Sequence, residues 1–319
     1  MSATPIHETL MYAVYFAPRG KKRLLGLGNQ LAQRHLSALD KLIGFIGDAG
    51  AGKSLLIKGM FPGLELTNDD EGINVRPLPL LKNLDKGFFS SHTYHVDVRF
   101  ESAFTQMHVL VDAIKRAIEQ DKRVIVEHFD IIYPHLGLNA EVLIGIGEEV
   151  IVTRPNIFGP QPKDIADIVY KSIKYRRMAH TAEDLTCKIL EEKFGFPHAQ
   201  NHSDVKHGFV LEFSEKPEID LELLERLVKK YIEDEVDISF MDENHIRIGE
   251  NEKFHCTGPR IHVRNTGEII NFRLLKEFKY DPISRQYALV GLVGSEKSVD
   301  IGDLNKIVLL SAMRKCNKI

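Results

Sequence analysis

The sequence predicts an α/β fold for the first half of the chain and an α+β fold for the second half. Up to about residue 175, short apolar runs alternate with amphipathic stretches, which is typical of a parallel sheet flanked by helices. Beyond that point, strands and turns follow one another with irregularly placed helices. The 319 residues also exceed the usual size of one domain, about 100–200 residues. We therefore expect two domains, residues 1–175 and 176–319.

The expected elements of the first half follow from the spacing of apolar residues. Strands are expected at 11–17, 42–46, 94–100 and 123–127, with one or two more within 141–152. Helices are expected at 24–39, from Ser54 to the Pro62-Gly63 breaker, at 102–120 and at 164–177. Residues 76–92 contain prolines and glycine among polar residues, so we expect a mobile loop there.

The expected elements of the second half are less regular. Helical spacing is found at 179–193 and 220–234, and a strand is expected at 208–213. Residues 237–248 are expected to be extended, and residues 254–291 to form short strands and turns.

The composition is that of a globular protein, and not of a strongly basic, membrane-spanning or disulfide-rich one. Hydrophobic residues make up 43% and charged residues 27% of the chain, as in a globular protein, and the net charge of −3 is not that of a generally basic nucleic-acid-binding protein. No apolar run approaches the roughly 20 residues that span a bilayer, and the N-terminus lacks a signal-peptide pattern. Cys187, Cys256 and Cys316 are too few, and odd in number, for a disulfide framework. We expect a cytoplasmic protein without a membrane partner.

The strongest local motif is the run Gly47-Asp48-Ala49-Gly50-Ala51-Gly52-Lys53-Ser54, between an expected strand and an expected helix. It fits the pattern G-x-x-x-x-G-K-[ST] of P-loop NTPases, whose backbone N–H groups surround phosphate oxygens. Lys53 would place its charge on the outer phosphates, and the Ser54 hydroxyl would reach Mg²⁺. An ordinary glycine turn is the alternative. We expect this loop to bind ATP or GTP with Mg²⁺.

Several carboxylates are candidates for the chemistry beside this loop. Glu127 ends an apolar strand and is our first choice for the metal-side acid. Asp69 and Asp70 are the candidate catalytic acids, although a solvated acidic turn explains them equally well. Asp97 and Asp130 compete for the same roles. With this arrangement, the first half resembles the uridine kinase and phosphoribulokinase branch of P-loop proteins over about 130 residues.

Basic residues could hold phosphates or nucleic acid. Arg154, Lys163 and the run 171–177 could act as phosphate clamps, and Arg19 to Arg23 with that run are the candidate contacts for a tRNA acceptor stem. The alternative for the run 171–177 is a solvated helix face.

Two motifs of the second half are more specific. Residues 176–185 read RRMAHTAEDL, and residues 256–269 read CTGPRIHVRNTGEI. They resemble the paired metal-binding motifs, H-x-x-x-H and C-x-x-x-H, of the second additional domain of threonyl- and alanyl-tRNA synthetases, an editing domain that also occurs free-standing. The strand at 208–213 and the segment 272–291 also resemble this family, so the likeness covers roughly residues 175–292.

The resemblance implies a Zn²⁺ site made by His180, Asp184, Cys256 and His262. Asp184 replaces the family's second helix histidine, and the interval from Cys256 to His262 is two residues longer than in the family. His255 or His202 could therefore take the place of His262, and a domain that keeps the fold without its metal is the alternative. The resemblance also implies a substrate pocket lined by Asn265, Thr266 and Glu268, while a tight turn explains the same run.

Three functions follow as expectations. In the first, the protein acts on aminoacyl-tRNA or a related aminoacyl compound by metal-assisted ester hydrolysis, coupled to the nucleotide-binding domain. In the second, it is a kinase of a nucleoside or small metabolite, and the editing-like domain selects the substrate or regulates. Nucleoside kinases that carry threonyl-synthetase-like domains resemble this combination, although their domain order differs. In the third, both domains are binding modules of a nucleotide-dependent sensor.

Overall fold

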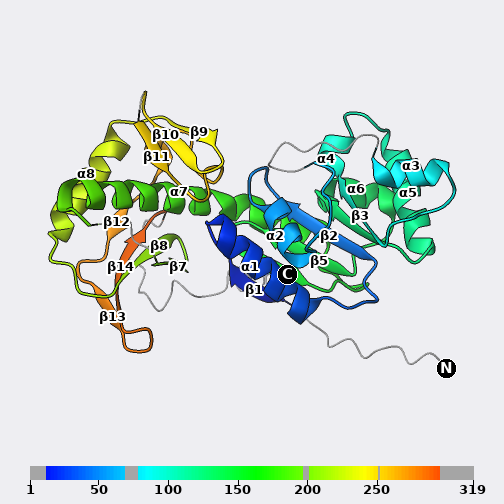
Figure 1. The fold of residues 1–319 in the computed structure, drawn as a ribbon, viewed down its shortest axis with the longest axis horizontal. Helices are drawn as coiled ribbons and strands as arrows, with labels where there is room; N and C mark the ends of the chain where they lie inside the picture. Colours follow the sequence, from blue (N-terminus) through cyan, green and yellow to red (C-terminus); the bar gives the residue numbers. More distant parts are fainter. Residues whose placement is uncertain (1–11, 69–77, 197–200, 251, 295–319) are drawn as a thin grey trace, which may run out of the picture. The chain divides into compact units, whose positions relative to one another are not determined.

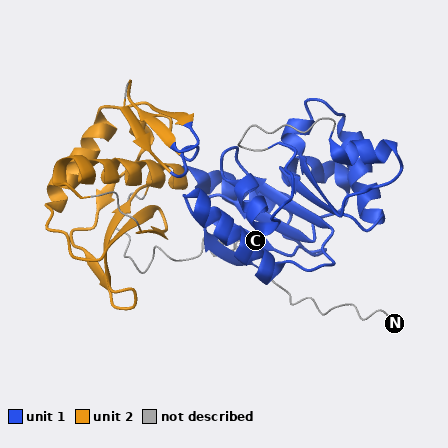
Figure 2. Cartoon of the chain, in the orientation of Figure 1, with its two compact units in different colours: residues 1–174, 242–244, 257–261 blue, residues 175–241, 245–256, 262–319 orange. Residues whose placement is uncertain are grey.

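The structure is a computed structural model that describes residues 12–68, 78–196, 201–250 and 252–294. The chain divides into two compact units (Figure 2). The first unit contains Met1–Lys174, Asp242–Asn244 and Thr257–Ile261, and the second contains Tyr175–Met241, His245–Cys256 and His262–Ile319. The main segment of the first unit thus ends one residue before the expected boundary, and two short segments from beyond that boundary also belong to the first unit. Among the described residues, no helix has the length and apolar character needed to cross a membrane.

A six-stranded mixed sheet forms the centre of the first unit (Figure 1). Its strands, in spatial order, are β1 (Ala13–Phe16), β6 (Glu149–Thr153), β5 (Val142–Ile146), β2 (Leu42–Gly47), β4 (Arg123–Glu127) and β3 (Thr93–Asp97). Neighbours from β5 to β3 are parallel, whereas β5, β6 and β1 pair antiparallel. Two residues join β5 to β6, which is too short for a parallel crossover. The expected largely parallel sheet is therefore a mixed one.

Helices cover both faces of this sheet because its strands are apolar on both sides. Leu42 and Ile46 of β2 pack in a cluster with α3 (Pro79–Asp85), α5 (Met107–Glu119) and α6 (Phe129–Leu136). Ile43 and Phe45 point to the other face and pack with α1 (Lys21–His35) and α2 (Lys53–Met60). The expected α/β class is confirmed at this level.

Two elements of the first unit differ from the sequence prediction. The segment 76–92 was expected to be a loop, but α3 lies within it and begins with Pro79, a residue suited to the first turn of a helix. The strand expected at 94–100 ends at Asp97, because the Asp97 carboxylate accepts a hydrogen bond from the Phe100 N–H and caps the short helix α4 (Val98–Glu101).

A single helix, α7 (Pro162–Phe194), replaces the two helices expected at 164–177 and 179–193. No glycine or proline interrupts the sequence after Pro162, so nothing in the chain ends the helix earlier. Every residue from 178 to 190 is buried, and this stretch forms the core of the second unit. A helix that is buried all round must satisfy its polar side chains internally.

Antiparallel sheets complete the second unit. The larger contains β7 (Asn201–Val205), β8 (Gly208–Phe213), β12 (Arg273–Leu274), β13 (Lys279–Asp281) and β14 (Gln286–Leu292). The smaller contains β9 (Ile238–Asp242), β10 (His245–Ile248) and β11 (Glu252–His255). The helix α8 (Leu221–Glu233) and one 3₁₀ turn, η1 (Thr266–Glu268), lie between strands along the chain. The expected strand at 208–213 matches β8, and the expected helix at 220–234 matches α8, whereas β7 was not expected.

Candidate functional site

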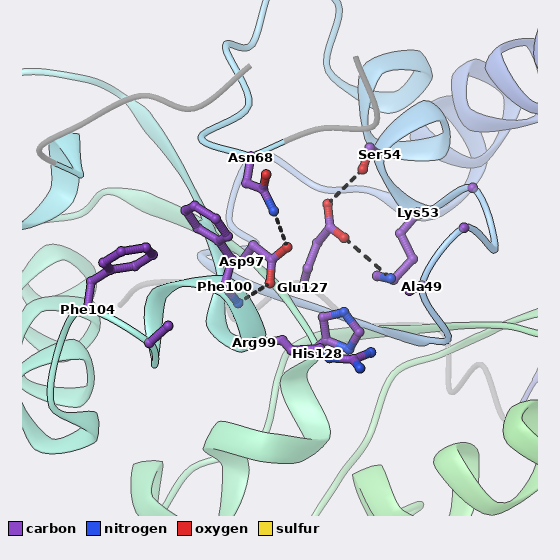
Figure 3. Close-up of a pocket in the computed structure, with 13 residues that line it drawn as sticks. Ala49, Lys53, Ser54, Asn68, Asp97, Arg99, Phe100, Phe104, Glu127 and His128 are labelled. Atoms are coloured by element: carbon purple, nitrogen blue, oxygen red, sulfur yellow. Dashed lines mark hydrogen bonds and ion pairs between the residues drawn. The ribbon is translucent and has the colours of Figure 1, made fainter. Parts of the chain in front are cut away.

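A cavity of about 420 Å³ lies in the first unit, beside the ends of three parallel strands (Figure 3). Parallel strands bring their carboxyl ends to one edge of the sheet, and ligands commonly bind there. The lining comes from the glycine-rich loop after β2, from the end of β3 with α4, and from the end of β4. The lining residues are Ala49, Gly50, Gly52, Lys53, Ser54, Asn68, Asp97, Arg99, Phe100, Ala103, Phe104, Glu127 and His128.

Two glycines of the glycine-rich loop have a left-handed backbone. Gly50 and Gly52 have φ angles of +74° and +95°, a left-handed region in which a side chain is strained. The helix α2 begins at Lys53, so unpaired backbone N–H groups of its first turn face the loop region. The Lys53 ammonium donates to the Asp48 carbonyl oxygen at 3.0 Å. A loop and a helix N-terminus of this kind suit an anion.

Glu127 lies buried at the end of β4, where the sequence predicted an acid. Its Oε1 accepts from the Ser54 hydroxyl at 3.3 Å, and its Oε2 lies 3.6 Å from the Lys53 Nζ. Burial by itself would raise the pKa of Glu127, but the hydrogen bond from His95 and the charge of Lys53 outweigh it and lower the pKa to about 2. Glu127 is therefore a carboxylate at neutral pH. It contacts Lys53 and Ser54, the two loop residues expected to bind phosphate and Mg²⁺.

His95, on β3, was not expected and holds Glu127 in place. The backbone N–H of Thr67 donates to His95 Nδ1 at 3.1 Å, so the ring proton is on Nε2. That Nε2 donates to Glu127 Oε1 at 3.1 Å. His95 thus fixes the orientation of the carboxylate next to the loop.

Asp97 is the second carboxylate that lines the cavity. It ends β3, directly opposite Glu127 in the parallel register of β3 and β4. One oxygen accepts from the Phe100 N–H at 3.0 Å and the other from Asn68 Nδ2 at 3.1 Å. Of the two competitors named above, Asp97 therefore reaches the cavity. Asp130 does not line it and accepts a hydrogen bond from the Tyr170 hydroxyl.

Asp69 and Asp70, the expected catalytic acids, lie outside the described residues. None of the basic candidates, Arg154, Lys163 and the run 171–177, is among the residues that line the cavity. Arg154 forms a bidentate ion pair with Asp40, at 2.7 and 2.8 Å, and is engaged within the fold. Arg176 is buried, which excludes it from a solvated helix face, whereas Lys163 is exposed.

The second unit brings together the four metal-ligand candidates, His180 and Asp184 of α7 with Cys256 and His262. One ligand atom of each lies within 4.8 Å of the others. The Cys256 sulfur lies 3.2 Å from His180 Nε2 and 3.8 Å from His262 Nε2. The longer interval before His262 therefore does not remove it from the cluster, and His255, which is exposed, does not replace it. Cysteine, imidazole and carboxylate groups are the ligands that Zn²⁺ takes in proteins.

The charge state of the cluster also suits a cation. His262 Nε2 lies 2.9 Å from Asp184 Oδ2. Burial alone would raise the pKa of Asp184, but His180 and His262 outweigh it, and the pKa lies below its ordinary value. Asp184 is therefore available as an anionic ligand.

A further carboxylate, Glu183, contacts the cluster residue His180 and also His202. Its two oxygens lie 3.3 Å from His180 Nδ1 and 2.9 Å from His202 Nδ1. With Nδ1 of His180 held by Glu183, Nε2 faces Cys256. Carboxylates that bind the outer nitrogen of a histidine ligand fix its orientation and raise its basicity. His202, an alternative ligand in the sequence prediction, is thus a partner of Glu183.

We expect Glu183→Gln to weaken Zn²⁺ binding by about 10–100-fold, because a neutral amide holds His180 Nδ1–H less strongly. The measurement is a competition titration of the full chain with a chromophoric zinc chelator. Glu212→Gln is the matched control, since Glu212 is also a hydrogen-bonded glutamate of the second unit, with Ser203 as its donor. Equal zinc affinity of Glu183→Gln and the wild-type protein would contradict this role.

Asn265, Thr266 and Glu268 form the tight turn that was the alternative to a substrate pocket. Asn265 Oδ1 caps η1 by accepting from the Gly267 N–H, and Glu268 accepts from the Asn265 N–H at 3.1 Å. The Thr266 hydroxyl is buried, donates to the Tyr231 carbonyl oxygen and accepts from the Val236 N–H. These polar groups stabilise the turn, and their role in a pocket stays a prediction.

Comparison of the sequence with models of protein families found no match, and comparison with curated proteins found no significant match.

Proposed function

We propose that the first unit is a P-loop kinase domain that binds ATP or GTP with Mg²⁺ in its cavity and phosphorylates the hydroxyl group of a small molecule. The observation that carries this proposal is the position of Asp97. It lines the same cavity as the loop residues Lys53 and Ser54, yet it is a different carboxylate from Glu127, which contacts the loop. A kinase needs both a carboxylate on the metal side and a second one for the attacking hydroxyl.

The residues present fit a bound Mg²⁺ and nucleotide. Mg²⁺ prefers oxygen ligands, and Ser54 and Glu127 offer a hydroxyl and a buried carboxylate 3.3 Å apart. The ion would neutralise charge on the phosphates. Lys53, which lies at the start of α2, would bind the outer phosphates together with the N–H groups of the loop.

In the proposed reaction, the acceptor hydroxyl oxygen forms a bond to the γ-phosphorus while the bond from that phosphorus to the β–γ bridging oxygen breaks. Asp97 takes the proton of the acceptor hydroxyl, and the diphosphate leaves. Each Asp97 oxygen accepts one hydrogen bond in the structure and keeps a lone pair for this task. Phe100 and Phe104, with ring centroids 5.2 Å apart, supply an apolar wall for the acceptor.

For the second unit we propose a Zn²⁺ site made by His180, Asp184, Cys256 and His262. Four protein ligands fill a tetrahedral zinc ion, as in structural sites, whereas catalytic sites keep a position open for water. Hydrolysis of an aminoacyl ester is therefore our second candidate function. It is favoured by the assembly of all four residues that the editing-domain resemblance identifies, and it requires that one ligand leave the metal.

We expect Asp97→Asn to lower the rate of phosphoryl transfer by about 10²–10⁴-fold, because the amide cannot accept the proton of the attacking hydroxyl. Transfer is measured from γ-labelled ATP and GTP to a panel of nucleosides and other hydroxyl-bearing metabolites. The affinity for the nucleotide should change little. Asp112→Asn is the control, since Asp112 is half exposed on α5 and pairs with Arg116.

If Asp97→Asn transfers phosphate as fast as the wild-type protein, Asp97 is not the catalytic base. A deacylation assay on mischarged tRNA, with and without ATP, examines the second candidate function. Hydrolysis that persists in Asp97→Asn and stops in Cys256→Ala, with no phosphoryl transfer to any acceptor, would favour that candidate over the kinase.

A further inference from the structure

Besides the glycine-rich loop, three side chains of the kinds that bind metal ions line the cavity of the first unit. They are Asp97 at the end of β3, Glu127 at the end of β4, and His128, which follows Glu127 and precedes α6. One ligand atom of each lies within 4.8 Å of the others. Figure 3 shows the three side chains together on the wall of the cavity.

His128 is buried and has no hydrogen bond to explain its position. Its side chain is 4% exposed, and within the described part of the chain no hydrogen bond reaches its ring nitrogens. Its ring nitrogens are not among the side-chain atoms that are both shut off from solvent and without a partner, so they are open to the cavity that His128 lines. The backbone of His128 is also left-handed, with φ of +57°, an uncommon conformation for a residue other than glycine. A ligand in the cavity would give the ring its missing partner.

The charges of the buried groups also favour a cation here. Asp97 and Glu127 are two buried carboxylates, and Lys53 is the single buried ammonium or guanidinium among the residues that line the cavity. Arg99 lines it as well, but its side chain is exposed to solvent. Buried charges require compensation, and one carboxylate charge is left over from the buried set. A divalent cation supplies that compensation.

The ligand set selects the kind of cation. Mg²⁺ and Ca²⁺ take oxygen ligands, whereas an imidazole nitrogen beside two carboxylates suits Mn²⁺, Fe²⁺, Co²⁺ or Zn²⁺. Each Asp97 oxygen keeps a lone pair beyond the one hydrogen bond that it accepts, from Phe100 or Asn68. Glu127 Oε1 accepts from both Ser54 and His95, so Glu127 would bind the ion through Oε2, which lies 3.6 Å from the Lys53 Nζ. The geometry of the site therefore does not require these hydrogen bonds to break.

We propose that Asp97, Glu127 and His128 bind a first-row transition-metal dication directly, without a nucleotide. This inference deepens the proposed function, since the ion would lie in the cavity assigned to the nucleotide. The inference also goes beyond the proposed function. A Mg²⁺ ion that is bound by the nucleotide and Ser54 needs no nitrogen ligand and therefore does not need His128.

The test is a titration of the nucleotide-free full chain with Mn²⁺, in which electron paramagnetic resonance counts free Mn²⁺. Each variant is also made in the Cys256→Ala background, which removes one ligand of the candidate metal site in the second unit. Mn²⁺ bound in the second unit can then be distinguished from Mn²⁺ bound in the first. We expect His128→Asn to weaken Mn²⁺ binding at least 10-fold and to remove the nitrogen coupling from the electron spin-echo spectrum of the bound ion. Asparagine tolerates the left-handed backbone, so this variant should fold.

His135→Asn, which changes an exposed histidine of the neighbouring α6, is the matched control and should bind Mn²⁺ like the wild-type protein. Asp97→Asn should weaken binding as His128→Asn does. Failure of the wild-type protein to bind Mn²⁺ without nucleotide would overturn the inference, as would nitrogen coupling that persists in His128→Asn. If ATP still binds, either result contradicts the Mn²⁺ site but not the proposed nucleotide site. If Mn²⁺ binds as expected and ATP does not, only the proposed nucleotide site is contradicted.

Discussion

Replacing Lys53 by alanine is expected to weaken binding of ATP or GTP by at least about 10–150-fold. Lys53 is buried at the start of α2, with its ammonium between the Asp48 carbonyl oxygen and the Glu127 carboxylate, and it is the residue of the loop that carries a positive charge. A hydrogen bond between charged groups contributes about 1.5–3 kcal/mol, which corresponds to that factor. The substitution also leaves the Glu127 carboxylate facing the phosphates without its cation.

Binding of a fluorescent ATP analogue to the full chain measures this effect. Lys53→Arg keeps the charge and separates its contribution from that of the lysine shape, while Lys58→Ala changes another lysine of the same helix α2 and should leave binding unchanged. Thermal unfolding shows whether each variant is folded. Nucleotide affinity of a folded Lys53→Ala protein equal to that of the wild-type protein would contradict the assignment of the loop.

Cys256→Ala is expected to abolish the proposed zinc binding by the second unit. Cys256 supplies the one sulfur ligand of the cluster, and its sulfur lies within 3.8 Å of both histidines. Because the proposed zinc ion would bind the folded cluster and not the unfolded chain, its loss should also destabilise the second unit. The loss amounts to about 2.7 kcal/mol when free zinc stands at 100 times its dissociation constant.

Zinc content by elemental analysis and thermal unfolding with and without a chelator measure both effects. Cys187→Ala is the matched control. Cys187 lies on α7 and is also a buried cysteine, but it is not part of the cluster. A wild-type protein purified without stoichiometric metal, and unaffected by added zinc, would show that the second unit keeps its fold without a metal site.

Local patterns predicted most of the elements, and the exceptions have physical reasons. The boundaries of β4 and β8 match the expected strands because apolar residues define both. β7 escaped prediction because it lies at the edge of its sheet and its sequence, NHSDV, is largely polar. The antiparallel pairing of β6 could not be derived from its composition, since the short link from β5 decides it.

The candidate sites were predicted where their residues form a motif and missed where their partners come from another element. The glycine-rich loop and the ligands of α7 are local in sequence. His95 and Glu127, by contrast, are 32 residues apart and meet because β3 and β4 are neighbours in the sheet. The choice of Asp97 over Asp130 likewise depends on which side chain reaches the cavity. Glu183 could have been found, because it lies three residues from His180 on the same helix.

We propose above all that the cavity of the first unit binds a nucleoside triphosphate with Mg²⁺. Calorimetric titration of the full wild-type chain with MgATP, and separately with MgGTP, tests it most directly. The structure predicts one site per chain for at least one of these nucleotides, with binding that weakens when Mg²⁺ is withdrawn. Absence of binding by both nucleotides at millimolar concentration, in a protein that unfolds cooperatively, would contradict it.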